Sequence, residues 1–153
     1  MDSADGLEIV HYDDGNKAWF RDGELHREDG PAFEYDDGSK TWYRHGKRHR
    51  EDGPAVDFAN GTKMWYRDGK QHRDDGPAVE YANGTKEWWK NGIRHREDGP
   101  AIEYADGTKS WYENGVAYDG PGPLAQQRFA VTMYCLDGRL PPEICRTVAS
   151  GYW

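Results

Sequence analysis

The chain has 153 residues, of which 35% are hydrophobic and 31% are charged, a composition close to that of disordered proteins. Its 28 acidic residues outnumber 20 basic ones and give a net charge of −8, which argues against nucleic acid or anionic lipid as the main partner, because both require a positive surface. Aromatic residues nevertheless make up 14% of the chain and recur in register, which predicts a thin, elongated fold rather than disorder.

After a short polar lead-in at residues 1–6, the chain repeats a 23-residue unit. The clearest marker is a tryptophan that returns every 23 residues, at Trp19, Trp42, Trp65, Trp88 and Trp111. A constant period in this range is the signature of a repeat architecture. We therefore predict about five copies within residues 1–122, with pairs of antiparallel strands at about 8–21, 31–44, 54–67, 77–90 and 100–113.

Three glycines punctuate each repeat, and the fourth copy shows them clearly. Asn83-Gly84 and Asn91-Gly92 predict two-residue hairpin turns, because both central residues of such turns adopt positive φ. Asp75-Gly76-Pro77 carries a proline, which cannot donate to a β-ladder, and we interpret it as a bulge or kink in a longer strand. The predicted fold is therefore mainly β, a single-layer antiparallel meander of hairpins with two strands per repeat.

Two-residue turns set a register and so divide the side chains between two faces. With Asn83-Gly84 as the turn, Val79 pairs with Trp88, and both are expected on the more apolar, packed face. The other face would combine columns of acids with columns of aromatic residues, which resembles an interaction surface. These candidate partner-binding residues are Glu34, Asp57, Glu80, Glu103, Tyr43, Tyr66, Trp89 and Tyr112. The acids predict a basic protein partner.

A histidine and an arginine stand side by side in the segment that links one repeat to the next, which is His72 to Pro77 in the fourth copy and which we call the linking segment. A metal site is one interpretation of the histidines, but copies about 10 Å apart lie too far from one another to share an ion. Packing of each histidine on the tryptophan opposite it also explains their spacing. The arginines and the acids that follow predict a ladder of ion pairs, and a constant lysine is expected over the tryptophan ring. These histidines are His26, His49, His72 and His95.

The repeated motifs do not predict catalysis. The sequence shows no nucleophile paired with a unique base, no glycine-rich phosphate loop and no zinc-ligand spacing. Catalysis needs a unique, asymmetric set of groups, whereas a repeat presents the same groups several times. We therefore predict that the protein is not an enzyme and that it uses no metal or other cofactor.

Residues 123–153 depart from the repeat and predict a helical tail. Apolar residues recur at helical spacing between Leu124 and Leu136, Asp137-Gly138 ends this segment, and Pro141-Pro142 opens a second short helix. The resulting helical hairpin would either cap the exposed last strand or dock a partner.

The cysteines and the lack of a signal-like stretch bear on location. Cys135 and Cys145 are too few for a disulfide framework and are expected to be core thiols in a reducing compartment. The N-terminus has no apolar signal stretch, and no apolar run approaches the ~20 residues of a membrane span. We predict an intracellular, cytoplasmic protein that is not secreted, or a virion component if the protein is viral.

The repeat resembles the MORN family (membrane occupation and recognition nexus). In the fourth copy, Trp88, Gly92, His95, Tyr81 and Gly84 match the family's tryptophan, first glycine, histidine, final tyrosine and final glycine. The family's His-Gly-x-Gly is His-Arg-Glu-Asp-Gly-Pro in this chain, so the repeat looks like a MORN variant. The resemblance implies stacked β-hairpins that serve as a scaffold or a binding surface. Lipid binding is often attributed to the family, but the acidic balance argues against it.

The sequence and the resemblance lead to one main functional hypothesis. We predict a non-enzymatic scaffold that binds a protein through one face of the sheet, through the tail, or through both. Leu140-Pro141-Pro142-Glu143-Ile144 is similar to the start of F-box-like helices, which end some repeat proteins of large DNA viruses. A structural subunit of an assembly such as a virion, with self-assembly, is therefore one alternative. Related variant repeats in bacterial immunity proteins make a toxin-neutralising binder the other.

Overall fold

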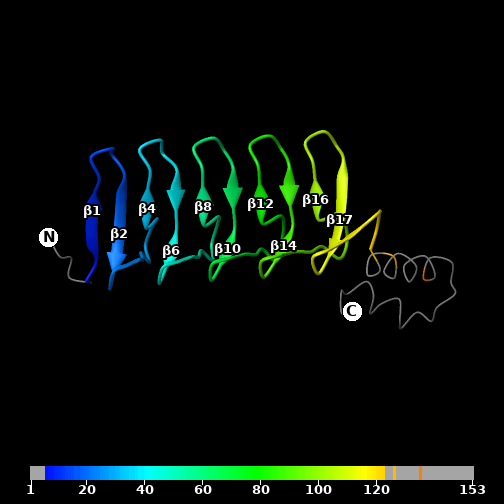
Figure 1. Cartoon of the computed structure of the whole chain (residues 1–153), viewed down its shortest axis with the longest axis horizontal. Coiled ribbons are helices and arrows are strands. Elements are labelled where there is room, and N and C mark those ends of the chain that lie inside the picture. Colours follow the sequence, from blue (N-terminus) through cyan, green and yellow to red (C-terminus); the bar gives the residue numbers. More distant parts are fainter. Residues whose placement is uncertain (1–5, 123–125, 127–134, 136–153) are drawn as a thin grey trace.

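The computed structural model describes residues 6–122 together with Gln126 and Cys135. The chain runs up and down along one axis as a meander of short antiparallel strands (Figure 1). The ascending strands are β1 (Glu8–His11), β4 (Phe33–Glu34), β8 (Val56–Asp57), β12 (Val79–Glu80) and β16 (Ile102–Glu103). The returning strands are β2 (Lys17–Arg21), β5 (Lys40–Thr41), β9 (Lys63–Met64), β13 (Lys86–Glu87) and β17 (Lys109–Glu113). The mainly β, antiparallel hairpin architecture predicted from the sequence is confirmed.

Smaller hairpins lie along the lower edge of the main sheet (Figure 1). At the two ends, β3 (Glu24–Leu25) pairs with β2, and β18 (Val116–Tyr118) pairs with β17. Between them lie three separate pairs, which are β6 (Tyr43–Arg44) with β7 (Lys47–Arg48), β10 (Tyr66–Arg67) with β11 (Lys70–Gln71), and β14 (Trp89–Lys90) with β15 (Ile93–Arg94). Backbone bonds such as Gly69 N–H to the Arg48 carbonyl, 2.9 Å, stack each lower hairpin on the previous one.

The upper turns contain one residue more than predicted. Glu80 pairs with Lys86, and the Tyr81 N–H donates to the Thr85 carbonyl across a three-residue loop. Only the glycine of this loop, Gly84, has positive φ (92°), which is the geometry of a type I turn followed by a one-residue bulge. Val79 therefore pairs with Glu87 instead of Trp88, and the predicted register of the upper hairpins is wrong by one residue.

The lower turns follow the prediction. Asn91 and Gly92 both have positive φ (53° and 83°), and the register pairs Lys90 with Ile93 and Trp89 with Arg94. This is the two-residue hairpin turn that Asn-Gly and Asp-Gly favour. The equivalent non-glycine residues of the other repeats also have positive φ, and they are Asp22, His45, Asp68 and Asn114.

The Asp-Gly-Pro segment interrupts the longer strand completely, where we expected a bulge or kink within it. Between β15 and β16 the backbone leaves the ladder, and the strand resumes only at Ile102. Trp88 sits at the point where the pairing changes: its N–H donates to the Ala101 carbonyl (2.8 Å), and its carbonyl accepts from the His95 N–H (3.1 Å). Each repeat thus joins the main sheet and its own lower hairpin through one tryptophan backbone.

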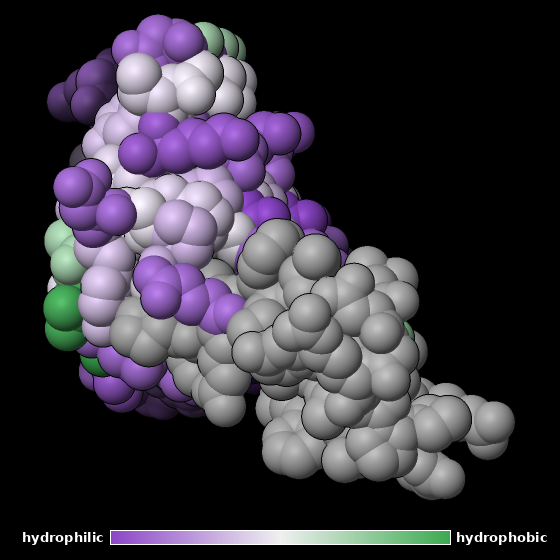
Figure 2. Space-filling model, turned by 90° about the vertical axis from the view of Figure 1, so that its right-hand side faces the viewer, coloured by the Kyte–Doolittle hydropathy of each residue, from purple (hydrophilic) through white to green (hydrophobic). Residues whose placement is uncertain are grey.

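The one-residue change in register redistributes the side chains between the faces. Val79, Tyr81, Glu87, Trp89 and Arg94 of the fourth repeat and their equivalents in the other repeats share one side, which we call the aromatic face. The other side, which we call the charged face, carries the acid column of Glu80, the lysine column of Lys86 and the tryptophan column of Trp88. Viewed from the end that bears β17, the array is narrow, and hydrophilic residues occupy most of the visible surface (Figure 2).

A row of alanines and a row of larger apolar residues form much of the buried interior of the sheet. A column of alanines is fully buried, and Val79 beside it has no exposed surface. The alanines of this column are Ala32, Ala55, Ala78 and Ala101.

The predicted helical tail falls almost wholly outside the described residues. Gln126 and Cys135 are helical. Cys135 is disulfide-bonded, so the expectation of a free core thiol at this position is wrong. The F-box-like segment lies outside the described residues.

Candidate functional site

On the charged face, each repeat holds an arginine between a tryptophan and a glycine. The Arg96 guanidinium lies 4.0 Å from the centre of the Trp88 ring. On its other side is Gly99, where a Cβ atom would come within 2.8 Å of the Arg96 Cζ. The same stacking occurs at Arg27, Arg50 and Arg73, with distances of 4.3, 4.0 and 4.1 Å to Trp19, Trp42 and Trp65. The cation over the tryptophan is therefore this arginine rather than the lysine that we predicted.

Further bonds lock the arginine in this position. The Arg96 Nε donates to Asp98 (3.0 Å), and its Nη1 donates to the Pro100 carbonyl (3.2 Å) and to Glu103 (3.0 Å). The predicted arginine–acid ladder is confirmed by the equivalent pairs to Asp29, Asp52 and Asp75, at 3.0, 2.8 and 3.0 Å. An acid of the predicted partner-binding column, Glu103, thus holds the arginine in place and helps to stabilise the repeat.

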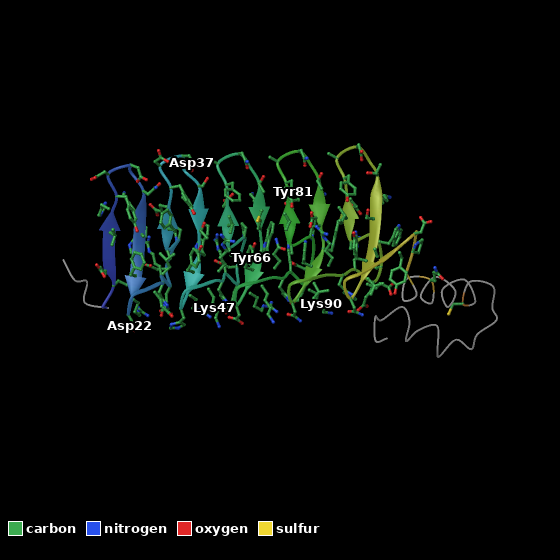
Figure 3. The ribbon with its side chains drawn as sticks, viewed as in Figure 1. Asp22, Asp37, Lys47, Tyr66, Tyr81 and Lys90 are labelled. Atoms are coloured by element: carbon green, nitrogen blue, oxygen red, sulfur yellow. The ribbon has the colours of Figure 1, made fainter. Side chains whose placement is uncertain are left out.

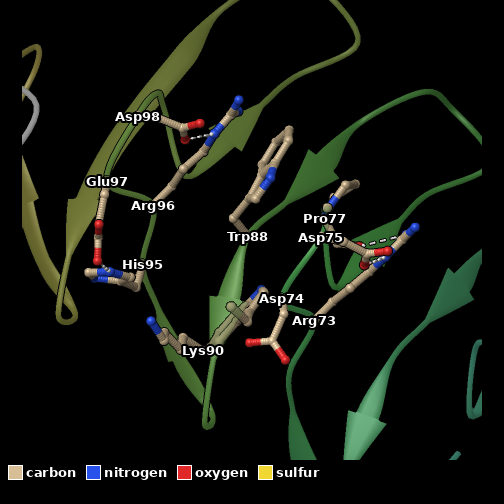
Figure 4. A pocket seen from close by; sticks show the side chains of 12 residues that line it. Arg73, Asp74, Asp75, Pro77, Trp88, Lys90, His95, Arg96, Glu97 and Asp98 are labelled. Carbon is tan, nitrogen blue, oxygen red and sulfur yellow. Dashed lines mark hydrogen bonds and ion pairs between the residues drawn. The ribbon is translucent and has the colours of Figure 1, made fainter. Parts of the chain in front are cut away.

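Hollows open between consecutive linking segments on this face. Figure 4 shows one of about 650 Å³, with Trp88 and Arg96 along one wall and Arg73 and Asp75 along the other. Equivalent hollows of about 580 and 500 Å³ lie along Trp42 and Trp65. Their carboxylates and guanidinium groups are paired with each other, so these hollows offer a partner little unsatisfied charge.

The repeated histidine joins one repeat to the next. The Asn91 N–H donates to Nδ1 of His72 (3.1 Å), and Asn91 is the first central residue of the lower turn in the following repeat. His72 has only 5% of its side chain exposed, and its Nε2 lies 3.1 Å from Asp74. The same backbone-to-imidazole bond recurs at His26, His49 and His95. The histidine therefore connects repeats, whereas we expected it to pack on the tryptophan.

The aspartates of the linking segments should make the folded protein less stable at acid pH. Hydrogen bonds from Arg27 and Arg50 lower the pKa of Asp29 and Asp52 below the usual 3.8. Because the folded-state pKa is lowered, this stabilisation is complete above pH ~4 and is lost as the pH falls through the folded value. We expect the urea midpoint to be constant from pH 7 to 5 and to fall below pH 4.

The pH measurement has an internal control. Asp52→Asn should make the decline in urea midpoint below pH 4 shallower, because it removes one of the coupled groups. Asp13→Asn, in an exposed upper turn, should leave the decline unchanged. Equal slopes for both variants would contradict the role of the Arg50–Asp52 pair.

The aromatic face carries few charged side chains among residues 6–122, and its middle row, which includes Val56, Val79 and Ile102, is 0–3% exposed. Its upper column of aromatic rings is 36–42% exposed and consists of Tyr12, Tyr35, Phe58, Tyr81 and Tyr104. A second column lies lower, at the level of the small hairpins, and consists of Phe20, Tyr43, Tyr66, Trp89 and Tyr112, all half-buried. Figure 3 shows Tyr81 near the upper turns and Tyr66 below it, while Lys47 and Lys90 lie along the lower edge.

Two arginines accompany the lower aromatic column. The Arg48 guanidinium lies 5.4 Å from the Tyr66 ring, and the Arg94 guanidinium lies 4.8 Å from the Trp89 ring. Glu87 is buried beside Arg94 and accepts hydrogen bonds from Trp89 Nε1 (2.8 Å) and Arg94 Nε (3.3 Å). Tyrosine, tryptophan and arginine are the residues most often found at the energetic centre of protein interfaces.

The structure separates the two sets of predicted partner-binding residues. Tyr43, Tyr66, Trp89 and Tyr112 lie on the aromatic face, whereas Glu34, Asp57, Glu80 and Glu103 lie on the charged face. The prediction that acids and aromatic residues share a face is therefore wrong, because it followed from the two-residue upper turn. The predicted lower register, which pairs Trp89 with Arg94 on one face, is confirmed, but the sequence interpretation did not name Arg48 or Arg94 as candidate partner-binding residues.

Within the described ranges, histidine, cysteine, aspartate and glutamate form no group of three or more that could hold a metal ion. None of the helical residues that the structure describes belongs to a helix long and apolar enough to cross a membrane. No protein-family model and no curated protein matches the chain.

Proposed function

We propose that this chain is a non-enzymatic MORN-like scaffold of about five β-hairpin repeats that binds a protein partner through its aromatic face. The observation that carries the proposal is the upper column of aromatic rings, 36–42% exposed, along one face of the sheet. A sheet with one apolar face is normally buried against another layer. A large exposed apolar surface on a soluble domain marks an interaction site.

The charged face supports the proposal by contrast. Its arginines, acids and tryptophans bond to one another in each repeat, as Arg96 does with Trp88, Asp98 and Glu103. These contacts stabilise the repeats themselves, so they explain why these side chains are present without a partner. Rings of the aromatic face also contact their neighbours, as Tyr35 does with Phe33, yet Tyr35, Phe58 and Tyr104 keep 37–41% of their surface exposed.

The test compares partner capture by matched variants that differ only in the face they alter. Tyr66→Ala with Trp89→Ala should reduce the affinity for a partner captured by the native chain by ~100-fold, since central aromatic residues contribute most of an interface's energy. Glu80→Ala with Glu103→Ala alters the charged face and should change that affinity by less than ~3-fold. Affinity is measured by surface plasmon resonance, and circular dichroism checks the fold of each variant.

A second pair of variants distinguishes weaker binding from a loss of folding stability. Tyr35→Ser and Tyr104→Ser alter the more exposed upper column, where truncation removes little buried surface. They should also weaken binding while the urea midpoint stays close to that of the native chain. Full binding by both the lower-column and the upper-column variants would refute the proposal.

A further inference from the structure

The charges beside the lower aromatic column decide which partner fits the aromatic face, and those that a partner could reach between β7 and β15 are positive. Along the column that follows the lower turns, the charged members are Arg48 and Arg94, and the others are Leu25, Gln71 and Ala117. The acids that the sequence interpretation placed beside the aromatic residues lie on the opposite face. The reason for expecting a basic partner is therefore absent from this surface.

Arg48 is available to a partner. It is exposed, and no carboxylate among residues 6–122 forms an ion pair with it. Partial burial lowers the pKa of Arg48, but its contacts with Tyr43 and Tyr66 outweigh this effect and raise the pKa, so the guanidinium stays charged. A planar guanidinium stacked on a ring presents its remaining N–H groups as a fork that matches a carboxylate.

Arg94 is held in place through its Nε atom, which leaves its two Nη atoms able to donate hydrogen bonds to a partner. Its Nε donates to the buried Glu87 (3.3 Å), while its guanidinium lies between the Trp89 ring at 4.8 Å and the Tyr112 ring at 5.6 Å. The two Nη atoms form no hydrogen bond with any described residue. Glu87 itself is 7% exposed and is occupied by Trp89, Tyr81 and Arg94, so it does not confront a partner.

We infer, on the basis of the proposed function, that the partner is a protein segment with apolar and acidic side chains that lies along the aromatic face. Arg48 and Arg94 are two repeats apart, which is four strand spacings or about 19 Å. An extended chain rises about 3.3 Å per residue, so this distance corresponds to about six residues. Side chains six positions apart on a strand point the same way, and two such acids would meet the two arginines.

The overall charge of the chain does not prevent this contact. The net charge is −8, but salt at physiological concentration screens exposed charges over about 8 Å. The exposed acids are concentrated on the charged face and in turns such as that of Asp37, which Figure 3 shows at the upper edge. Glu8 lies opposite Phe20 at the first strand of the aromatic face, and Glu87 is buried. A carboxylate that approaches this face between β7 and β15 would therefore meet the two arginines first.

In the test, a display library of random 12-residue peptides is selected for binding to the full chain. The enriched peptides are then synthesised, and their affinities for the chain and its variants are measured. Peptides that lose binding with Tyr66→Ala and Trp89→Ala occupy the aromatic face, and these should be enriched in Asp and Glu at positions about six apart. Arg48→Glu should weaken them by at least ~10-fold, as expected for loss of a charge-assisted pair. Arg67→Glu with Lys70→Glu, which alters the opposite side of a lower hairpin, should change binding by less than ~2-fold.

The outcomes separate this inference from the proposed function. Face-dependent peptides that are basic or uncharged, or that ignore Arg48→Glu, would overturn the acidic partner and leave the binding face intact. Enriched peptides that bind the Tyr66→Ala, Trp89→Ala variant normally would contradict the proposed function itself. A dimer of the chain alone in sedimentation equilibrium that Tyr66→Ala dissociates would show that a second copy occupies the face, and would also overturn the inference.

Discussion

Replacing His72 with leucine should lower the free energy of unfolding by about 2 kcal/mol, because the buried imidazole loses its contacts with the Asn91 N–H, Arg67 and Asp74 together. His72 is 5% exposed, and its Nδ1 accepts from the Asn91 N–H of the next repeat at 3.1 Å. A backbone N–H can only donate, so Nδ1 acts as the acceptor in this bond. The Nε2 atom lies 2.9 Å from Nη1 of Arg67 and 3.1 Å from Asp74. The imidazole thus joins the turn of the next repeat to charged groups on its other side.

Asparagine provides the matched substitution at this position. In His72→Asn the side-chain oxygen takes the place of Nδ1, so the Asn91 N–H keeps an acceptor while the Nε2 contacts are lost. We expect a cost of about 1 kcal/mol, half that of leucine. His11→Leu in β1, at an exposed position, should change the unfolding free energy by no more than about 0.5 kcal/mol.

Urea unfolding followed by tryptophan fluorescence measures all three variants. Equal destabilisation by His72→Leu and His11→Leu would show that the bond between repeats contributes nothing measurable. Equal destabilisation by His72→Leu and His72→Asn would show that the shape of the imidazole matters more than its acceptor atom.

The second large effect is expected at Gly99. A methyl group there would lie 2.8 Å from Cζ and 2.9 Å from Nε of Arg96, which the Trp88 ring confines on its other side at 4.0 Å. Gly99→Ala should therefore displace the guanidinium and weaken its bonds to Asp98 and Glu103, at a cost of about 2 kcal/mol. Gly99 is not among the residues with positive φ, so the requirement for glycine here is space, not backbone conformation.

A double-mutant cycle identifies the mechanism. In an Arg96→Ala background there is no guanidinium to displace, and adding Gly99→Ala should cost less than about 0.5 kcal/mol. Gly107→Ala is the control: a Cβ there meets nothing within 4 Å, but φ is 85°. It should cost about 1 kcal/mol through backbone strain with or without Arg96. If the cost of Gly99→Ala is unchanged by Arg96→Ala, the Trp–Arg–Gly packing is not its cause.

The two kinds of turn show why local sequence predicted one half of the repeat better than the other. Asn91-Gly92 has two residues of positive φ, as the dipeptide alone suggests. Asn83-Gly84 looks the same in sequence, yet only Gly84 has positive φ. The Asn83 side chain accepts from the Thr85 N–H (2.9 Å), and the Thr85 hydroxyl accepts from the Ala105 N–H of the next upper turn (3.2 Å). The second bond joins different repeats, so local sequence alone does not reveal it.

A signal for the correct register was nevertheless present. Pairing Val79 with Glu87 collects nearly all charged columns on one face and leaves the other almost uncharged, whereas pairing Val79 with Trp88 mixes acids and aromatic residues on one face. Register is set by the pattern that buries one face, and a slip of one residue exchanges the faces. Choosing the register that best separated charged from uncharged columns would have placed Tyr66 and Trp89 correctly and would have moved Glu80 to the charged face.

The sequence by itself determined the period of 23 residues, the antiparallel hairpins and the lower turns, because these depend on residue spacing and on the φ preferences of Asx-Gly pairs. The tertiary structure decided what depends on contacts between repeats. These contacts include the bond from His72 to the next lower turn and the stacking of Arg96 between Trp88 and Gly99. They also place Arg48 beside Tyr66 of the following repeat, 18 positions along the chain, at a distance that only the stacking of hairpins sets.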